Sequence, residues 1–151
     1  MPDELEGRNQ RSALFKTMFL AFRCAGACDW SSKLGIALDH SGWQHYLQFH
    51  HIFPKAVLKD HYTSREIDDI ANLCFIAGKT NRTISDKEPA LYFSTIAHQD
   101  KDKAFLTQCI PTDSQYLSVG VYKEFLQERR RRIAARLNEF IGGKWKAKMD
   151  S

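Results

Sequence analysis

The sequence has few features of membrane, secreted or repetitive proteins. No stretch approaches the roughly 18 consecutive apolar residues that a membrane-spanning helix needs. The chain starts with the acidic and polar MPDELEG, whereas a secretory signal has a basic segment followed by an apolar one. Internal repeats and low-complexity tracts are absent as well. We therefore expect a cytoplasmic globular protein that makes no contact with a membrane.

Cysteine is scarce, with residues at positions 24, 28, 74 and 109. Without a secretory signal, these four residues favour reduced thiols over a disulfide framework. Cys24 and Cys28 are spaced closely enough to supply two ligands of a tetrahedral zinc site, but a second close pair is missing. Free cysteines are the favoured interpretation, and zinc binding by this pair is left open.

The 151 residues include 43% hydrophobic and 12% aromatic side chains, which suffices for the core of one domain. We predict a single, mostly helical α+β domain over residues 1–151. It divides into an N-terminal helical part (1–43), a middle part (44–98) and a C-terminal helical part with a basic tail (99–151).

Hydrophobic periodicity predicts where the main elements lie. A helical apolar stripe covers 11–27, and a second one runs over 116–141, where Gly142 and Gly143 should end the helix. The middle part holds a β-prone stretch over 46–53, closed by Pro54, and a short apolar run over 73–77, closed by Gly78. Thr80 is a plausible cap for a short helix, and Pro89 suits the first turn of the next one.

Positive charge is concentrated at the C-terminal end of the chain. The formal net charge is +4, and residues 120–151 hold nine Lys or Arg against four Asp or Glu. Such asymmetry is compatible with a phosphate backbone as partner, although a basic helix is often only a solvated face.

The adjacent His50 and His51 are the best candidates for chemistry. A neutral imidazole can accept a proton from water at neutral pH or bind a divalent metal ion. Successive side chains on a strand point to opposite faces, so the two rings should do different work.

The run HHIFP at 50–54, Asn72, and the dipeptide Asn81-Arg82 together resemble the HNH (His-Me finger) endonuclease signature. The nine-residue step from Asn72 to Asn81 also resembles the HNH domain of RNA-guided CRISPR nucleases. The resemblance implies a ββα-metal core, in which two antiparallel strands and a helix surround one ion.

Carried over to this chain, the resemblance implies roles for four residues. His51 would be the general base, and His50 and Asn81 would bind Mg²⁺, with Mn²⁺, Ni²⁺ or Zn²⁺ also permitted by an imidazole ligand. Asn72 would either fix the His51 ring or brace the loop. Nuclease colicins of this superfamily end in His-x-x-x-His, whereas this chain has Ser85 at the last position, so two neutral ligands remain.

Four cations near this motif in sequence could hold DNA phosphates: Lys55, Lys79, Arg82 and Lys87. Solvated loop charges are an equally good interpretation of any one of them.

A wider resemblance extends over most of the chain. FHHIFPK at 49–55, IANL at 70–73, PALYF at 89–93 and YKEFL at 122–126 are similar to the C-terminal nuclease part of GmrSD-type, modification-dependent restriction proteins. It implies a role in restriction or phage defence, DNA or modified DNA as substrate, and a ParB-like nucleotide-hydrolysing domain or subunit outside this chain. The alternative is a module that keeps the scaffold, has lost catalysis and only binds nucleic acid or protein. Cleavage of RNA and assembly into a homodimer are both left open.

Overall fold

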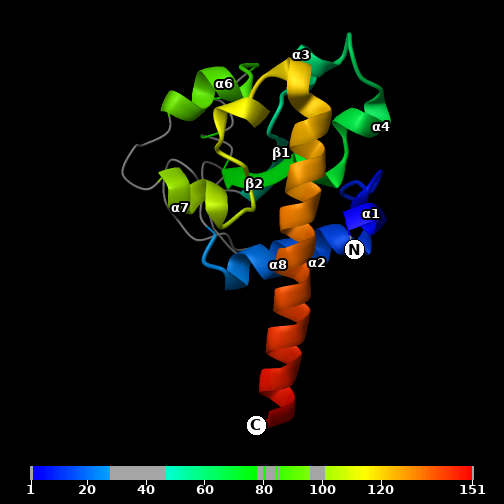
Figure 1. Cartoon of the computed structure of the whole chain (residues 1–151), viewed down its shortest axis with the longest axis vertical. Coiled ribbons are helices and arrows are strands. Elements are labelled where there is room, and N and C mark those ends of the chain that lie inside the picture. Colours follow the sequence, from blue (N-terminus) through cyan, green and yellow to red (C-terminus); the bar gives the residue numbers. More distant parts are fainter. Residues whose placement is uncertain are drawn as a thin grey trace.

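The computed structural model describes residues 2–27, 47–77, 80, 84, 86–95 and 101–150. Within these ranges only the backbone is described for residues 2, 47–48, 77, 95, 101–103 and 143–150. The fold is a mostly helical α+β arrangement with a two-stranded antiparallel sheet and a long C-terminal helix (Figure 1).

The sheet is a pair of five-residue strands, β1 (Leu47–His51) and β2 (Leu73–Ala77). Their register pairs Leu47 with Ala77 and His51 with Leu73. The predicted second strand is confirmed with the same bounds. β1 ends earlier than predicted, because the chain bends at Ile52 and Phe53 before Pro54 begins the next helix.

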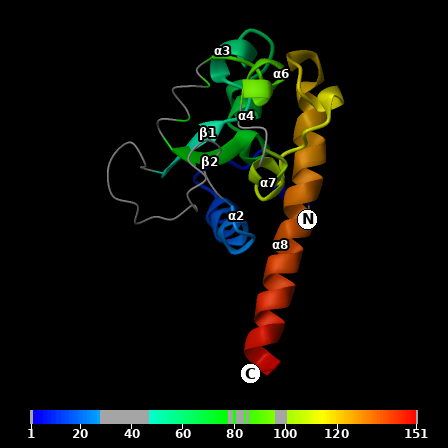
Figure 2. The same ribbon diagram turned by 90° about the vertical axis from the view of Figure 1, so that its left-hand side faces the viewer.

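The first predicted amphipathic helix is confirmed as α2 (Ala13–Cys24), which begins after Ser12 as N-cap. The Ser12 hydroxyl accepts a hydrogen bond from the Leu14 N–H and so satisfies one free amide of the first turn. α2 packs its aromatic side against the sheet: the rings of Phe15 and Phe19 each lie 5.1 Å from that of Phe75. Burial of this stripe fixes α2 beside the strands (Figure 2).

Several short helices had no separate counterpart in the sequence prediction, since three to six residues are too few to display a helical period. They are α1 (Pro2–Leu5), α3 (Lys55–Leu58), α4 (Ser64–Ile67), η1 (Ile70–Asn72), α7 (Lys101–Leu106), η3 (Ser114–Tyr116) and η4 (Val119–Val121). α3, α4 and η1 occupy the polar insert between the two strands.

Pro89 stands in the first turn of α6 (Pro89–Tyr92), as predicted, and the chain continues as η2 (Phe93–Thr95). The helix expected after Thr80 falls mainly outside the described residues. Thr80 and Ile84 themselves are helical and buried.

The C-terminal helix α8 (Tyr122–Asp150) runs along the whole molecule, and its last turns extend beyond the other elements (Figures 1 and 2). The sequence placed its start at residue 116 and its end at Gly142, and both limits were wrong. η3 and η4 precede it, and the helix passes through the two glycines. A helical glycine costs only about 1 kcal/mol relative to alanine, which neighbouring helix formers can offset.

α8 contributes to both hydrophobic clusters of the core. One lies between α8, the chain after β1 and α6, and includes Phe53, Tyr92 and Phe125. The other joins α8 to α1, α2 and β2, and includes Phe22 and Ile133. None of the described helices combines the length and apolar character needed to cross a membrane.

Candidate functional site

The two histidines form the last residues of β1, where the strand meets the bend leading to α3. The register sets His50 opposite Cys74 and His51 opposite Leu73. The preceding Phe49 contacts Phe15 of α2, with 5.6 Å between ring centroids. Because side chains alternate along a strand, His50 belongs to the face opposite α2, which carries buried Cys74.

His50 lies in a partly buried position that favours the uncharged imidazole. Burial, and secondly the nearby charge of His51, lowers the pKa of His50 from 6.5 to about 4. At neutral pH the ring is therefore unprotonated and keeps one nitrogen lone pair, which is the form that binds a metal ion.

His51 has a different environment. Its Nε2 atom lies 2.8 Å from Oδ1 of Asp68, and the side chains are 25% and 44% exposed. Asp68 follows α4 and is separated from His51 by 17 residues. The sequence analysis missed this residue, since no spacing rule links an acid in a polar insert to a strand end.

Asn72 is completely buried and braces the bend after His51. Its Oδ1 accepts a hydrogen bond from the Phe53 N–H at 2.8 Å. Its amide nitrogen donates to the carbonyl oxygens of Phe53 (3.1 Å) and Ile67 (3.0 Å). Because both amide protons are used on the backbone, bracing is the role that the geometry supports, and Asn72 does not hold the His51 ring directly.

The other predicted metal ligand, Asn81, lies outside the described residues, as do Lys79 and Arg82 and one member of the cysteine pair, Cys28. In the part of the chain that is described, no three His, Cys, Asp or Glu side chains gather closely enough to hold a metal ion. The metal site predicted from His50 and Asn81 has two protein ligands, so it does not require a cluster of three such side chains.

Two predicted phosphate-binding lysines are described, and both are exposed. Lys55 opens α3, four residues after His51. Lys87 lies three residues after Ile84, and the Lys87 N–H donates a hydrogen bond to the Ile84 carbonyl. Either side chain is available to an external anion.

The arginine run of α8 is instead engaged within the protein. Arg129 is fully buried, and Arg130 bonds to the buried Asp69 at 2.7 Å. Arg131 and Arg132 both contact Glu128, at 2.6 and 2.9 Å. The hydrogen bonds from these two arginines lower the pKa of Glu128 to about 2. Arg129 and Arg130 thus join α8 to other elements, whereas Arg131 and Arg132 pair with Glu128 within the helix. Much of the positive charge that suggested a nucleic-acid partner is therefore engaged inside the protein.

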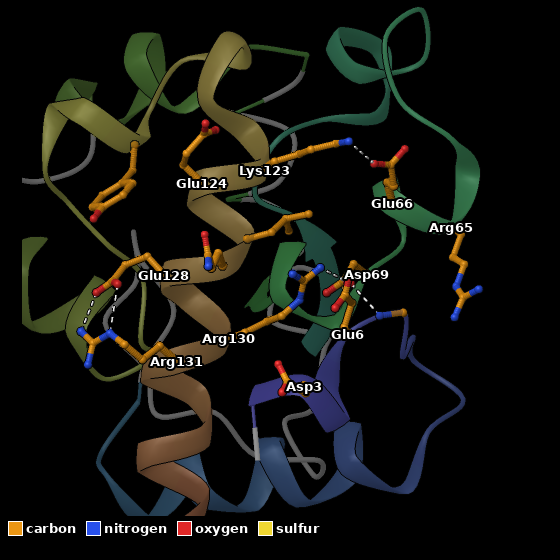
Figure 3. Close-up of a pocket in the computed structure, with 14 residues that line it drawn as sticks. Asp3, Glu6, Arg65, Glu66, Asp69, Lys123, Glu124, Glu128, Arg130 and Arg131 are labelled. Atoms are coloured by element: carbon orange, nitrogen blue, oxygen red, sulfur yellow. Dashed lines mark hydrogen bonds and ion pairs between the residues drawn. The ribbon is translucent and has the colours of Figure 1, made fainter.

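A groove of about 1120 Å³ runs between α1, α4 and α8, and no histidine lines it (Figure 3). Its charged lining comprises six acidic and four basic side chains: Asp3, Glu6, Glu66, Asp69, Glu124, Glu128, Arg65, Lys123, Arg130 and Arg131. A net negative lining would repel a phosphate backbone, so this groove is not where nucleic acid should bind.

Comparisons of the chain with family models, with curated proteins and with solved structures found no match.

Proposed function

We propose that this chain is a metal-dependent endonuclease of the HNH kind, which hydrolyses DNA phosphodiester bonds with His51 as general base. One observation carries the proposal: β1 ends in two imidazoles with different surroundings. His50 is neutral and half-buried, whereas His51 is held by a carboxylate.

The arrangement around the pair supports the same assignment. The antiparallel strands β1 and β2 are followed in the chain by helical, buried Thr80 and Ile84, in the order of a ββα-metal core. Asn72 holds the bend after His51 through hydrogen bonds to the Phe53 and Ile67 backbone. A fixed general base needs no reordering when substrate binds, which favours catalysis.

In this function His51 removes a proton from the attacking water, and His50 with Asn81 would hold Mg²⁺ through neutral donors. The bound ion would stabilise the charge that develops on the phosphate and on the departing 3′ oxygen. Exposed Lys55 and Lys87, with Lys79 and Arg82, would bind flanking phosphates without reading sequence.

The biological setting is proposed from the resemblance to GmrSD-type proteins. The substrate would be DNA or modified DNA in cytoplasmic restriction or phage defence, with a nucleotide-hydrolysing ParB-like domain or subunit supplied from outside this chain. One site per chain cuts one strand at a time, so a homodimer or rebinding would be needed to cut both.

The test is cleavage of supercoiled plasmid in Mg²⁺ or Mn²⁺, compared between unmodified and hydroxymethylated or glucosylated DNA. We expect nicking by the wild type that EDTA abolishes and that His51→Ala reduces by a factor of at least about 100. His61→Ala is the matched control, because His61 is exposed and its side chain forms no hydrogen bond or ion pair with the described residues.

Undiminished cleavage by a folded His51→Ala variant, or activity indifferent to EDTA, would overturn the proposed mechanism. Retarded DNA mobility without cleavage of any of these substrates would favour the alternative, a binding module that has lost catalysis.

A further inference from the structure

Asp68 is held in place by its neighbours on both sides. The Asp68 N–H donates to the Ser64 carbonyl at 2.9 Å, which closes α4. The Glu66 carbonyl accepts from the Tyr122 hydroxyl at 2.7 Å, and the Ile67 carbonyl accepts from Asn72. The backbone before Asp68 is thus fixed to both α8 and η1.

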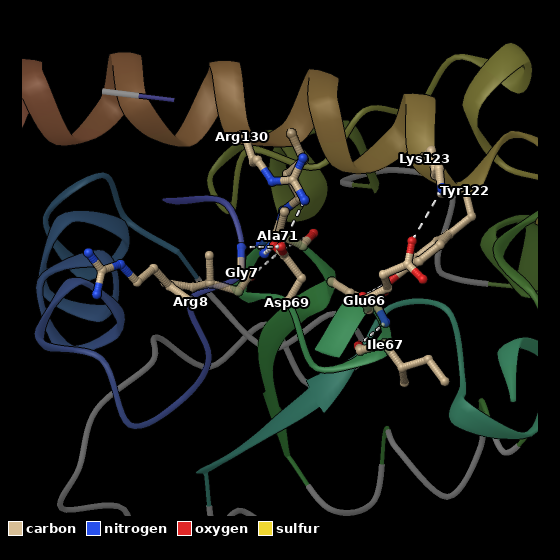
Figure 4. A network of polar contacts seen from close by, with 12 residues as sticks. Gly7, Arg8, Glu66, Ile67, Asp69, Ala71, Tyr122, Lys123 and Arg130 are labelled. Atoms are coloured by element: carbon tan, nitrogen blue, oxygen red, sulfur yellow. Dashed lines mark hydrogen bonds and ion pairs between the residues drawn. The ribbon is translucent and has the colours of Figure 1, made fainter. Parts of the chain in front are cut away.

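The next residue, Asp69, anchors the other side of Asp68 (Figure 4). Its carboxylate accepts hydrogen bonds from the backbone N–H groups of Gly7 and Ala71 and pairs with Arg130. Asp69 is 2% exposed, whereas the side chain of Asp68 is 44% exposed and points to the end of β1. Two consecutive acids therefore differ: one secures the backbone, and the other reaches His51.

The chemistry of the pair fixes the state of the His51 ring. An ionised carboxylate can only accept hydrogen bonds, so at 2.8 Å the Nε2 atom of His51 must carry its proton. A neutral imidazole has a single N–H, and the lone pair then lies on Nδ1. Of the two ring nitrogens, Nδ1 is therefore the one left to accept a proton.

Among the described residues, the side-chain partner of the Asp68 carboxylate is His51. This is the ring that the proposed function makes the base.

We propose that Asp68 is a positioning residue for His51, which holds Nε2–H and directs Nδ1 toward the attacking water. The inference rests on the proposed nuclease function and adds to it the residue that orients the base. Groups that orient a catalytic or ligating histidine in this manner typically contribute a factor of 10 to 100.

The kinetic test uses the full chain with Asp68→Ala, Asp68→Asn and the matched control Asp60→Ala. Asp60 is an exposed acid of the same insert, and its side chain forms no hydrogen bond or ion pair with the described residues. We expect Asp68→Ala to lower kcat about 10- to 100-fold while KM for DNA and the metal requirement are unchanged. Asp68→Asn should recover part of kcat, because an amide oxygen still accepts from Nε2–H, and Asp60→Ala should equal the wild type.

A second measurement does not depend on cleavage. In the metal-free protein, ¹⁵N NMR of the neutral His51 ring should show the Nε2–H tautomer, with an Nε2 proton that exchanges with water faster in Asp68→Ala. A wild-type ring in the Nδ1–H form, or equal exchange in both proteins, would overturn the inference.

These outcomes separate the two proposals. Wild-type kcat in Asp68→Ala, with His51→Ala inactive, would refute the role of Asp68 and leave the nuclease function standing. A wild type that cuts no DNA would refute the nuclease function, and the NMR result would still decide whether Asp68 sets the His51 tautomer.

Discussion

Arg129 illustrates how a single residue can hold several elements together. Its guanidinium is fully buried and donates to the carbonyl oxygens of Ala71 (2.8 Å), Leu73 (2.5 Å) and Gln108 (3.0 Å). Burial lowers the pKa of Arg129 to about 10, so the group still carries its charge at neutral pH. Besides these carbonyl groups, the guanidinium faces the ring of Phe22, whose centroid lies 6.0 Å away. Arg129 thereby joins α8 to η1, β2 and the chain after α7.

Replacing Arg129 should therefore be costly. In Arg129→Met several buried carbonyl groups lose their donor, and we expect the free energy of unfolding to fall by about 3 kcal/mol or more. Arg131→Met is the matched control, because Arg131 is exposed and, among the described residues, its side chain pairs with Glu128 of the same helix. Urea unfolding followed by far-UV circular dichroism measures both. Equal midpoints for the two variants would contradict the anchoring role of Arg129.

Among the elements, α8 departs most clearly from the sequence prediction. Gly142 looked like a helix end, since glycine commonly follows the last helical residue with a positive φ. Upstream, however, Ile133 and Leu137 are buried and fix the helix against the body. Gly142 has no positive φ, and a Cβ atom there would meet nothing within 4 Å. Helix propagation from an anchored segment costs little per residue, so the helix continues.

The backbone conformations of Gly142 and Gly7 predict opposite effects of replacing each glycine by alanine. Gly142→Ala should leave stability unchanged or raise it by up to about 1 kcal/mol, with more signal at the helical CD band. Gly7→Ala should destabilise, because Gly7 has φ +75° and an added Cβ would meet the Arg65 side chain at 2.5 Å. A clear loss of stability in Gly142→Ala would indicate that the helix ends there after all.

For the whole molecule, the placement of charge differs from its distribution along the sequence. The C-terminal segment holds most of the excess positive charge, yet Arg129 to Arg132 bind protein groups. The groove beside α8 has a negative lining. The cations left for a phosphate backbone in the described chain therefore include Lys55 and Lys87, near the candidate site in sequence.

DNA binding should accordingly depend on these lysines. If each contacts one phosphate, Lys55→Ala and Lys87→Ala should each reduce the slope of log K against log salt by about 1. Lys16→Ala is the control, because Lys16 is exposed on α2. Salt titrations by fluorescence anisotropy give the slopes. An equally large change of slope in Lys16→Ala would show that DNA binding depends on net charge and not on Lys55 and Lys87 in particular.

The sequence alone determined those features that local physics controls. The apolar stripe of α2, the short strand β2 and the place of Pro89 in α6 follow from periodicity, β propensity and the fixed φ of proline. That the adjacent histidines lie on a strand was also predictable, because they belong to one short β-prone segment, although the strand ends two residues earlier than predicted.

Tertiary structure decided the features that depend on residues far apart in the chain. The contact of Asp68 with His51 bridges 17 residues, and that of Arg129 with Leu73 bridges 56. Whether Asn72 would meet an imidazole or the backbone depended on which partners the folded chain brought within reach, and they were backbone groups of Phe53 and Ile67. A hydrogen bond requires its donor and acceptor atoms to lie about 3 Å apart. Composition and residue spacing do not predict such distances between remote residues, because packing of the whole chain sets them.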